Sequence, residues 1–526
     1  MQETIIKELS TPSTPQLPTR LIDLKPADAR AHLLESEQYM TMSLPGYLDF
    51  GAVLRQVEEL VGDTPLEECL KAKLPATLDA NHTIMTSKDG AYAMRPISLS
   101  NPLLYYCLVR ELTSRNTWSQ IRRAFASATD KRIAVSSLPL IPQPQEAFRQ
   151  ATTILNWWQE VERRSVELSL DYSYMLVTDI TNCYGTLDMR LLSEILPRAT
   201  GGRLAYLVQL LQGGSPIGIP QGAEPYNLIA ELVLAAIDKR LMERLLAEGI
   251  SEGFHIIRYR DDYRIYSNDR EQLERIYSAL QAVLLGANCQ LSISKTGITN
   301  DIILSSIKRD KLYMIENTPI ASKKGCDFDS VQKYLTFTLL FATRYRDSGS
   351  ICSLMSDLLR RVEERSIYWD RSAPAPLCAM VVQLLQHNPR IYLSGMKLLV
   401  LLMEEMPTEE RVALKRRIRR RLLGSILNSA VAQLWMQLLF VCDGVVEAEP
   451  TDAVLCRWVA GEPLQLWDRS FLRGKYAQFD YEAPLLEREQ LVEQAKKPIV
   501  TGVDLYELLS QGVWESLLGS STATTE

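Results

Sequence analysis

The stretch RYRDDYRIY, Arg258 to Tyr266, follows His-Ile-Ile and, with these preceding residues included, sets two adjacent aspartates between two short runs that are rich in tyrosine and isoleucine. These residues favour β-strands, whereas acidic residues favour tight turns. We therefore expect a β-hairpin with Asp261 and Asp262 at its tip. Because neighbouring carboxylates repel each other, the pair indicates either a bound divalent cation or an ordinary turn exposed to water.

A third aspartate, Asp179, ends the apolar run Tyr174 to Val177, which predicts a buried strand. A carboxylate at the end of such a strand is a common metal ligand. Carboxylates from two strand ends can hold two metal ions about 3.5–4 Å apart, an arrangement that serves phosphoryl transfer. Mg²⁺ suits this arrangement because it binds carboxylate and phosphate oxygens.

Two further segments accompany the aspartates. The loop GIPQGAEPYN, Gly218 to Asn227, leads into a predicted helix. Its glycines let the backbone approach a ligand, and a helix start favours anions. Lys295, in LSISKTG, follows a predicted strand at Cys289 to Ser294 and could donate a proton to a leaving group. The alternatives are an ordinary loop and a solvated lysine.

Around these motifs, the order strand, helices, strand, turn, strand, helix, strand predicts an α+β sheet with helices on one face. Upstream, HTIMTSKDGAYAMRPISL has two β-prone runs around Asp89-Gly90, which is a hairpin signal. One helix is expected over Pro102 to Ala128. Beyond about residue 330, nearly every segment has the pattern of an amphipathic helix.

Composition sets further limits. The chain has 526 residues and a net charge of −6 from 58 basic and 64 acidic side chains. The length predicts several domains, and the mild acidity argues against coating nucleic acid by bulk charge, although a local basic groove stays open. Nine cysteines without a C-x-x-C pair and only four histidines argue against a zinc site and favour reduced thiols in the cytoplasm. We expect no secretory signal and no membrane span.

The ordered set of Asp179 with Tyr184 five residues on, then Pro-Gln-Gly, Tyr-x-Asp-Asp and Ser-Lys-Thr, resembles the palm of reverse transcriptases over about residues 80 to 300. The resemblance implies an α+β right-hand polymerase palm with fingers, followed by an all-α C-terminal domain that is a bundle or HEAT-like. The implied division is an N-terminal helical segment, fingers with palm, and a helical domain in place of a thumb, at residues 1–80, 81–315 and 316–526.

The same resemblance assigns roles to individual residues. The implied metal ligands and catalytic residues are Asp179, Asp261, Asp262, the backbone carbonyl of Ile180, and Lys295. The implied contacts to the incoming nucleotide are Lys88, Arg95, Tyr184, Gln221 and Gly222. Tyr184 would close the sugar pocket against a 2′-hydroxyl, and Tyr259 likewise favours DNA synthesis over RNA synthesis.

The implied cofactor is a pair of Mg²⁺ ions, for which Mn²⁺ can substitute. The implied substrates are deoxynucleoside triphosphates, with a DNA product and a non-coding RNA as a candidate template. An RNA polymerase is disfavoured by Tyr184.

The helical C-terminal half resembles that of bacterial abortive-infection and defence-associated reverse transcriptases. This implies a cytoplasmic enzyme of antiphage defence, with protein-primed, untemplated and RNA-templated synthesis all open. We also expect a homo-oligomer and a partner protein encoded nearby. Two alternatives are a retron- or intron-like enzyme that copies a dedicated RNA, and a catalytically silent palm whose helical repeats sense phage. The intact set of three aspartates argues against the silent palm.

Arginines at two places suggest contacts to nucleic acid. Arg258 and Arg260 flank the aspartates, where they either contact phosphates or compensate charge within the strand pair. Arg416, Arg417 and Arg420 belong to a basic run that either tracks phosphates or forms a solvated helix face near several glutamates.

Overall fold

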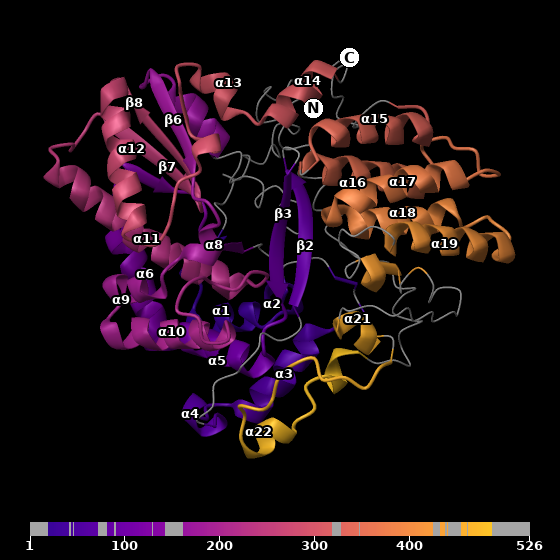
Figure 1. The fold of residues 1–526 in the computed structure, drawn as a ribbon, viewed down its shortest axis with the longest axis horizontal. Helices are drawn as coiled ribbons and strands as arrows, with labels where there is room; N and C mark the ends of the chain where they lie inside the picture. Colours follow the sequence, from indigo (N-terminus) through magenta and orange to yellow (C-terminus); the bar gives the residue numbers. More distant parts are fainter. Residues whose placement is uncertain are drawn as a thin grey trace, which may run out of the picture.

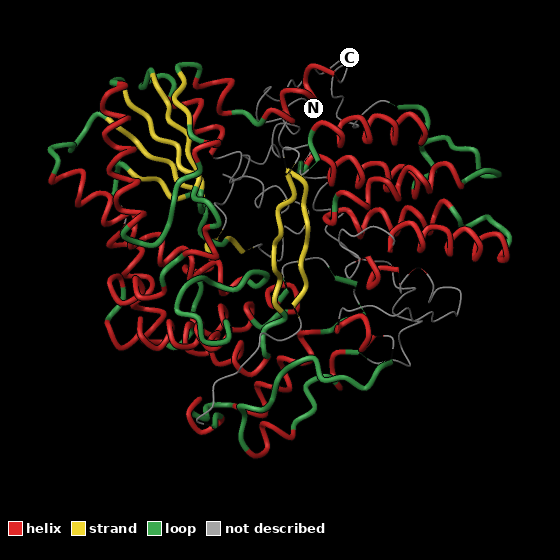
Figure 2. The backbone as a smooth tube through the Cα atoms, in the orientation of Figure 1, coloured by secondary structure: helices red, strands yellow, loops and turns green. Residues whose placement is uncertain are grey.

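The computed structural model describes residues 19–40, 44–45, 47–71, 81–88, 91–128, 130–141, 161–317, 328–346, 348–423, 432–436, 439, 454–459 and 461–486. Figure 1 shows a sheet with its helices on the left, a long hairpin in the centre and a stack of helices on the right. Figure 2 shows most of the strands gathered in the sheet and the hairpin, with helices around them. The predicted α+β class is confirmed.

The central sheet has five strands in the order β4-β7-β8-β6-β9. Their bounds are Ile133–Val135 (β4), Tyr174–Asp179 (β6), Phe254–Tyr259 (β7), Asp262–Ser267 (β8) and Gly297–Thr299 (β9). β7 and β8 form the predicted hairpin, and because Tyr259 pairs with Asp262, the turn consists of Arg260 and Asp261. β6 runs antiparallel to β8 and pairs Asp179 with Asp262. The register therefore brings the predicted aspartates to one end of the sheet.

One face of this sheet packs on two long helices, α11 (Glu224–Ala247) and α12 (Arg270–Leu285). Leu176, Ile256 and Ile265 point to this side and join the main core. α11 is buried along most of its circumference, which is typical of a helix inside a core. We call this side of the sheet the α11 face.

The opposite face carries the alternate side chains of the same strands, because successive residues point to opposite sides. Here Met175, Ile257 and Tyr266 pack with Val161, from helical residues 161–168, and with α13 (Ile302–Ser306). Helices therefore cover both faces in part, and the prediction of helices on one face was wrong. Asp179 lies an even number of residues from Met175, and Asp262 from Tyr266, so both aspartates are on this face of the sheet. We call it the carboxylate face.

The strand predicted at Cys289 to Ser294 does not form. The chain there makes an isolated bridge from Leu291 to the end of β6 and then a short 3-10 helix, Ile293–Lys295. The Thr296 hydroxyl donates to the Ser292 carbonyl at 2.7 Å and closes this turn. Pairing with β6 resumes only in β9.

The helix predicted over Pro102 to Ala128 is two helices, α5 (Pro102–Leu112) and α6 (Arg115–Ala128). The break falls at Thr113, whose hydroxyl donates back to the Val109 carbonyl at 2.7 Å. A hydroxyl that bonds to the preceding turn competes with continued helix, which explains the interruption.

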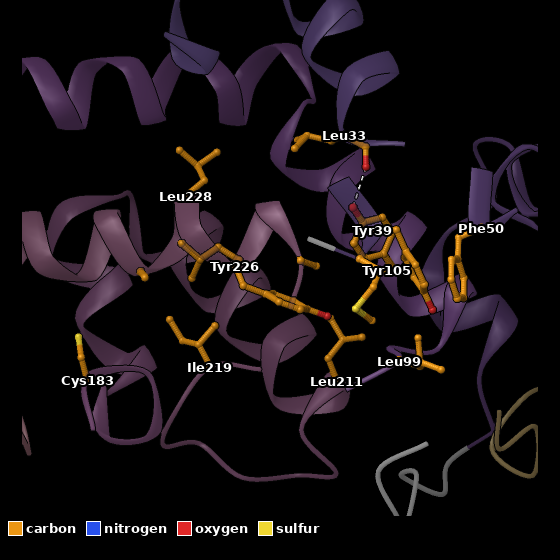
Figure 3. Packing of buried hydrophobic residues seen from close by; sticks show 14 of the residues in the cluster. Leu33, Tyr39, Phe50, Leu99, Tyr105, Cys183, Leu211, Ile219, Tyr226 and Leu228 are labelled. Atoms are coloured by element: carbon orange, nitrogen blue, oxygen red, sulfur yellow. Dashed lines mark hydrogen bonds between the residues drawn. The ribbon is translucent and has the colours of Figure 1, made fainter. Parts of the chain in front are cut away.

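The N-terminal helices pack on α5 through a core rich in tyrosine. This part contains α1 (Pro26–Leu33) and α3 (Phe50–Val61). Tyr105 of α5 is fully buried and donates to the Leu33 carbonyl at 2.7 Å (Figure 3). Tyr226 at the start of α11 lies in the same core, so the N-terminal helices and α11 share one packed interior.

The hairpin predicted around Asp89-Gly90 is present as β2 (Asn81–Lys88) and β3 (Ala91–Ser98). It stands between the sheet and the helical stack in Figure 1. The stack holds the helices predicted for the C-terminal half: α15 (Val331–Arg344), α16 (Ser350–Glu363), α17 (Ala375–His387), α18 (Tyr392–Leu402) and α19 (Thr408–Leu423).

The chain then returns to the N-terminal helices. Residues 461–486 are mostly turns and short helices, and the Asp49 amide donates to the Leu485 carbonyl at 2.9 Å. Within the described residues, no helix is long and apolar enough to span a membrane. The cysteines in the same residues are all buried.

Candidate active site

Three carboxylates meet where β6 ends and the hairpin turns. Asp179 is the last residue of β6, Asp261 is the second residue of the turn, and Asp262 begins β8. Each offers an oxygen, and these oxygens all lie within 4.8 Å of one another. Asp179 is buried and the other two are half-buried. We call these three residues the carboxylate triad; the sequence motifs had singled out all of them.

The triad carries more negative charge than its surroundings offset. Burial, and then the charges of Asp261 and Asp179, raise the pKa of Asp262 to about 7. Burial and Asp179 also raise the pKa of Asp261. The Lys295 ammonium pairs with Asp179; burial acts to lower the pKa of Lys295, but the bond to Asp179 raises it overall. The charges of Lys295 and Arg260 therefore offset the three carboxylates only in part.

This arrangement fits a divalent cation. Carboxylate oxygens are the ligands that Mg²⁺ and Mn²⁺ take, and the raised pKa values of Asp261 and Asp262 are those of carboxylates that lack enough positive charge nearby. The three side chains come from separate positions of a rigid strand pair, so their spacing is fixed by the backbone.

The turn that holds Asp261 is strained. Arg260, its first residue, has φ +52°, in the left-handed region. That region costs a residue with a Cβ roughly 1–2 kcal/mol. Two contacts hold the turn: the Ile180 amide donates to the Asp261 carbonyl at 3.0 Å, and Arg258 Nη1 donates to the Arg260 carbonyl at 3.3 Å. Ile180, the expected carbonyl ligand, is thus buried beside the turn and anchors it through its amide.

The side chain of Arg258 lies inside the protein, whereas the expected contact with phosphates would need it at the surface. Its side chain points to the α11 face and is fully buried. Nε donates to Asp238 at 2.7 Å and Nη1 donates to Glu231 at 3.0 Å. Tyr263 Oη adds a bond to Asp238 at 3.1 Å. Arg258 therefore compensates acids of α11 and not, as the alternative had it, acids within the strand pair. We call Arg258, Glu231 and Asp238 the ion network.

The guanidinium of Arg260 lies near Tyr184, Tyr259 and Glu224. Burial acts to lower the pKa of its guanidinium, but Tyr184, Tyr259 and Glu224 outweigh burial and raise it. This side chain is therefore near the residues expected to bound the sugar of a nucleotide. Its contact with phosphate stays a prediction.

Tyr184 is held in place by a short polar chain. It lies on α8 (Cys183–Thr186), just after β6, and its hydroxyl donates to Asn227 Oδ1 at 2.6 Å. Asn227 Nδ2 in turn donates to Glu224 Oε2 at 2.7 Å. Burial raises the pKa of Tyr184 and that of Glu224. The ring of Tyr184 is thus tied to the first turn of α11.

The loop before α11 wraps around the Tyr184 backbone. The Ile219 amide donates to the Tyr184 carbonyl at 2.7 Å. Gly218 has φ +91°, and a Cβ there would lie 3.1 Å from the Gly185 carbonyl oxygen, so this position favours glycine. Gln221 and Gly222 follow in the same loop and are half-exposed. The glycines of this loop were expected to let the backbone approach a ligand. At Gly218, the backbone instead lies close to the backbone of Gly185 in the protein itself.

A cavity of about 250 Å³ opens beside the triad on the carboxylate face. Its floor is apolar, with Val177 and Ile257, and Tyr259 and Asp262 form part of its wall. The remaining charged lining residues are the cations Arg264, Lys308 and Arg309. The cavity thus joins a positive rim to one carboxylate of the triad.

Other predicted residues lie away from this centre or outside the described side chains. Lys88 and Arg95 are in β2 and β3, whose side chains lie outside the described part. Arg416, Arg417 and Arg420 are exposed on α19, whereas Lys415 and Arg419 of the same helix are buried. The roles assigned to all of these residues stay predictions.

Sequence reasoning missed the polar residues of α11. Glu231 and Asp238 are seven residues apart, two helical turns, and stand in an otherwise apolar run. Acids on one face of a buried helix require a buried cation, and this signal could have led to Arg258. Asn227 and the cavity-lining residues after β9 gave no comparable signal, because only the fold places them near Tyr184 and Asp262.

Comparison with known proteins adds to this geometry. Residues 114–337 match the family model described as reverse transcriptase (RNA-dependent DNA polymerase). No curated protein matches the chain.

Two solved structures are among those to which the chain is similar. The telomerase of Candida albicans in complex with a fragment of telomeric RNA has 12% identity and a TM-score of 0.31, covering 68% of this chain and 67% of that one. The apo telomerase of Candida tropicalis has 9% identity and a TM-score of 0.30, covering 84% of this chain and 71% of that one. The residues that match this family model include the carboxylate triad and Lys295.

Proposed function

We propose that this protein is a divalent-metal-dependent DNA polymerase of reverse-transcriptase type that adds deoxynucleotides to a 3′-hydroxyl. The observation that carries the proposal is the convergence of the carboxylate triad within the stretch that matches the reverse transcriptase family. Asp179, Asp261 and Asp262 would hold Mg²⁺, for which Mn²⁺ can substitute. Two such ions supply activation of the attacking hydroxyl and neutralisation of the charge on the leaving pyrophosphate.

Other side chains would bind the substrate and handle the proton. Lys295, which pairs with Asp179, would hold a proton near the leaving group. Tyr184, tied to Asn227, would present its ring edge to the sugar and favour deoxynucleotides. The positive rim of Arg264, Lys308 and Arg309 would hold the phosphates of the strand whose end reaches Asp262.

We further propose the division into an N-terminal helical segment, fingers with palm, and a helical domain at residues 1–80, 81–315 and 316–526, and a role in bacterial antiphage defence. The support for the defence role is the resemblance noted in the sequence, together with the stack of helices α15 to α19 beyond the sheet. The exposed arginines of α19 would contact the product or a template RNA.

The test is nucleotide incorporation by the purified protein. The wild type should incorporate labelled deoxynucleotides in the presence of Mg²⁺, and the double variant Asp261→Ala, Asp262→Ala should not. Asp171 is exposed and precedes the start of β6, at the end away from the triad, so Asp171→Asn is the control for removing a negative charge outside the site. Incorporation by the double variant at the wild-type level would contradict the proposal.

The material bound to the protein then distinguishes the modes of synthesis. Digestion with DNase, RNase and protease separates DNA attached to the protein, which indicates protein priming, from a tightly bound RNA, which indicates a dedicated template.

A further inference from the structure

We propose that Arg258 is a positioning residue for the carboxylate triad, an inference that rests on the proposed metal site. Its guanidinium, fixed by Glu231 and Asp238 beneath the sheet, holds the strained turn at Arg260 and so sets where Asp261 and Asp262 lie relative to Asp179. Arg258 would not touch metal or substrate.

The first support is the geometry of the guanidinium. Arginine presents donors in a rigid planar fork, and here the fork is used in three directions. Nε donates to Asp238 at 2.7 Å, while Nη1 is shared between Glu231 at 3.0 Å and the Arg260 carbonyl at 3.3 Å. The same group therefore joins a buried helix to the backbone of the catalytic turn. Lysine, with one ammonium, cannot reproduce this bridge.

The second support is that the ion network is poorly suited to stabilising the fold alone. Two carboxylates face one guanidinium, and all three side chains are buried. Two polar atoms of the network, Glu231 Oε1 and Arg258 Nη2, find no hydrogen-bond partner among the described residues. A buried ion network that is incompletely satisfied adds little stability compared with apolar packing. We therefore assign the network a role in holding the turn at Arg260.

The third support is the strain at the turn. Arg260 has φ +52°, a conformation that glycine adopts readily and arginine avoids. Strained residues persist only where the surroundings hold them. The Ile180 amide holds the turn from β6 at 3.0 Å, and Arg258 holds it from the α11 face. Without the second contact, Asp261 and Asp262 would relax away from Asp179.

The experiment compares Arg258→Lys with Tyr263→Phe. Both variants lose part of the polar contacts to Asp238, but only the first loses the bond to the Arg260 carbonyl. The readout is the affinity for Mn²⁺, titrated by the loss of the free-ion EPR signal, alongside the melting temperature. We expect Arg258→Lys to weaken Mn²⁺ binding about tenfold, the scale found when a supporting residue of a metal site is changed. Tyr263→Phe should stay within about twofold of the wild type.

A second variant separates positioning from general loss of structure. Adding Arg260→Gly to Arg258→Lys should restore most of the Mn²⁺ affinity, because glycine holds a positive φ without support. If Arg258→Lys does not fold, Glu231→Gln, which weakens the hold on Nη1, should shift Mn²⁺ affinity in the same direction by a smaller factor.

Unchanged Mn²⁺ affinity in folded Arg258→Lys, or in Glu231→Gln where only that variant folds, would overturn the inference. So would a Tyr263→Phe variant that loses as much affinity as Arg258→Lys. The readout does not require nucleotide incorporation. A wild type that binds Mn²⁺ at the triad but polymerises nothing would therefore contradict the proposed function and still leave the role of Arg258 to be decided by these titrations.

Discussion

Two clusters of carboxylates lie on opposite faces of the same strand pair, and they are balanced differently. On the α11 face, the acids of the ion network are buried against the guanidinium of Arg258. On the carboxylate face, the half-exposed ammonium of Lys295 pairs with Asp179, and the charge of Arg260 acts on Asp261 from nearby. The same kind of side chain thus forms a fully buried support on one face and a partly exposed ligand set on the other. The difference in burial, together with a cation that bonds directly to both acids on one face, distinguishes a structural acid from a metal ligand.

The largest effect on stability should come from removing the charge that balances the α11 face. Arg258→Leu leaves two buried carboxylates without a cation, which we expect to lower the free energy of unfolding by about 3–5 kcal/mol. Urea denaturation measures this change. If the loss is under about 1 kcal/mol, the two clusters do not differ as described.

On the carboxylate face, removing a charge should stabilise the metal-free protein instead of destabilising it. In a chelator at pH 8, Asp262→Asn removes one of three repelling charges and should raise the free energy of unfolding by about 1 kcal/mol. The pKa of Asp262 in the folded protein, about 7, lies above that of an unfolded aspartate. The metal-free wild type should therefore lose stability, relative to the variant, as pH rises from about 4 to about 7.

Urea denaturation of both proteins at pH 5 and pH 8 checks this sign. Adding Mg²⁺ at pH 8 should reverse the ranking, because only the wild type retains the full ligand set. A metal-free variant that is less stable than the wild type at pH 8 would show that the triad is compensated by the protein alone.

The third prediction concerns the polar chain that ties the sugar pocket to α11. Asn227→Leu removes the acceptor of the Tyr184 hydroxyl and frees the ring. Discrimination against ribonucleotides should fall by about tenfold, because a small displacement of a positioned group has large kinetic effects. Tyr184→Phe, which keeps the ring, should lose less than Tyr184→Ala. The effect is measured as the ratio of incorporation of a deoxynucleotide to that of the ribonucleotide with the same base. An unchanged ratio in Asn227→Leu would show that the position of the Tyr184 ring does not determine the choice of sugar.

The smallest effect should come from the surface of α19, where buried and exposed cations again differ. Arg417→Gln with Arg420→Gln removes two exposed charges, whereas Lys415 and Arg419 are buried. The slope of log affinity for single-stranded nucleic acid against log salt should fall by about 1.4 if both contact phosphates. Arg122→Gln with Arg123→Gln on α6 is the matched control. Equal slopes in the two double variants would make the α19 face an ordinary solvated surface.

Much of the sheet and its catalytic turn could be predicted from sequence because local patterns specify them. The apolar run that ends at Asp179, the paired aspartates and the glycine-rich loop each have a short-range signature, and their order suggested one palm. The strand at Cys289 to Ser294 was misplaced because hydroxyl-to-backbone bonds there favour a turn over an extended ladder.

What could not be predicted depends on long-range placement. Alternation along β7 puts Arg258 on the face opposite Asp262, yet its acidic partners lie 20 and 27 residues away on a helix. The sequence shows arginines beside aspartates but not which side of the sheet each one faces. The cavity beside Asp262 likewise depends on how the segment after β9 folds back, which no local pattern reveals.

The most direct test of the central claim is deoxynucleotide incorporation by the wild type and Asp179→Asn as Mg²⁺ is added back to chelator-treated protein. Asp171→Asn serves as the charge-matched control. We predict no incorporation without metal, a rise with Mg²⁺ in the wild type and the control, and a loss of at least about a thousandfold in Asp179→Asn. Incorporation in the chelator, or a wild-type Mg²⁺ response in Asp179→Asn, would contradict the assignment of the carboxylate triad as the metal-binding catalytic centre.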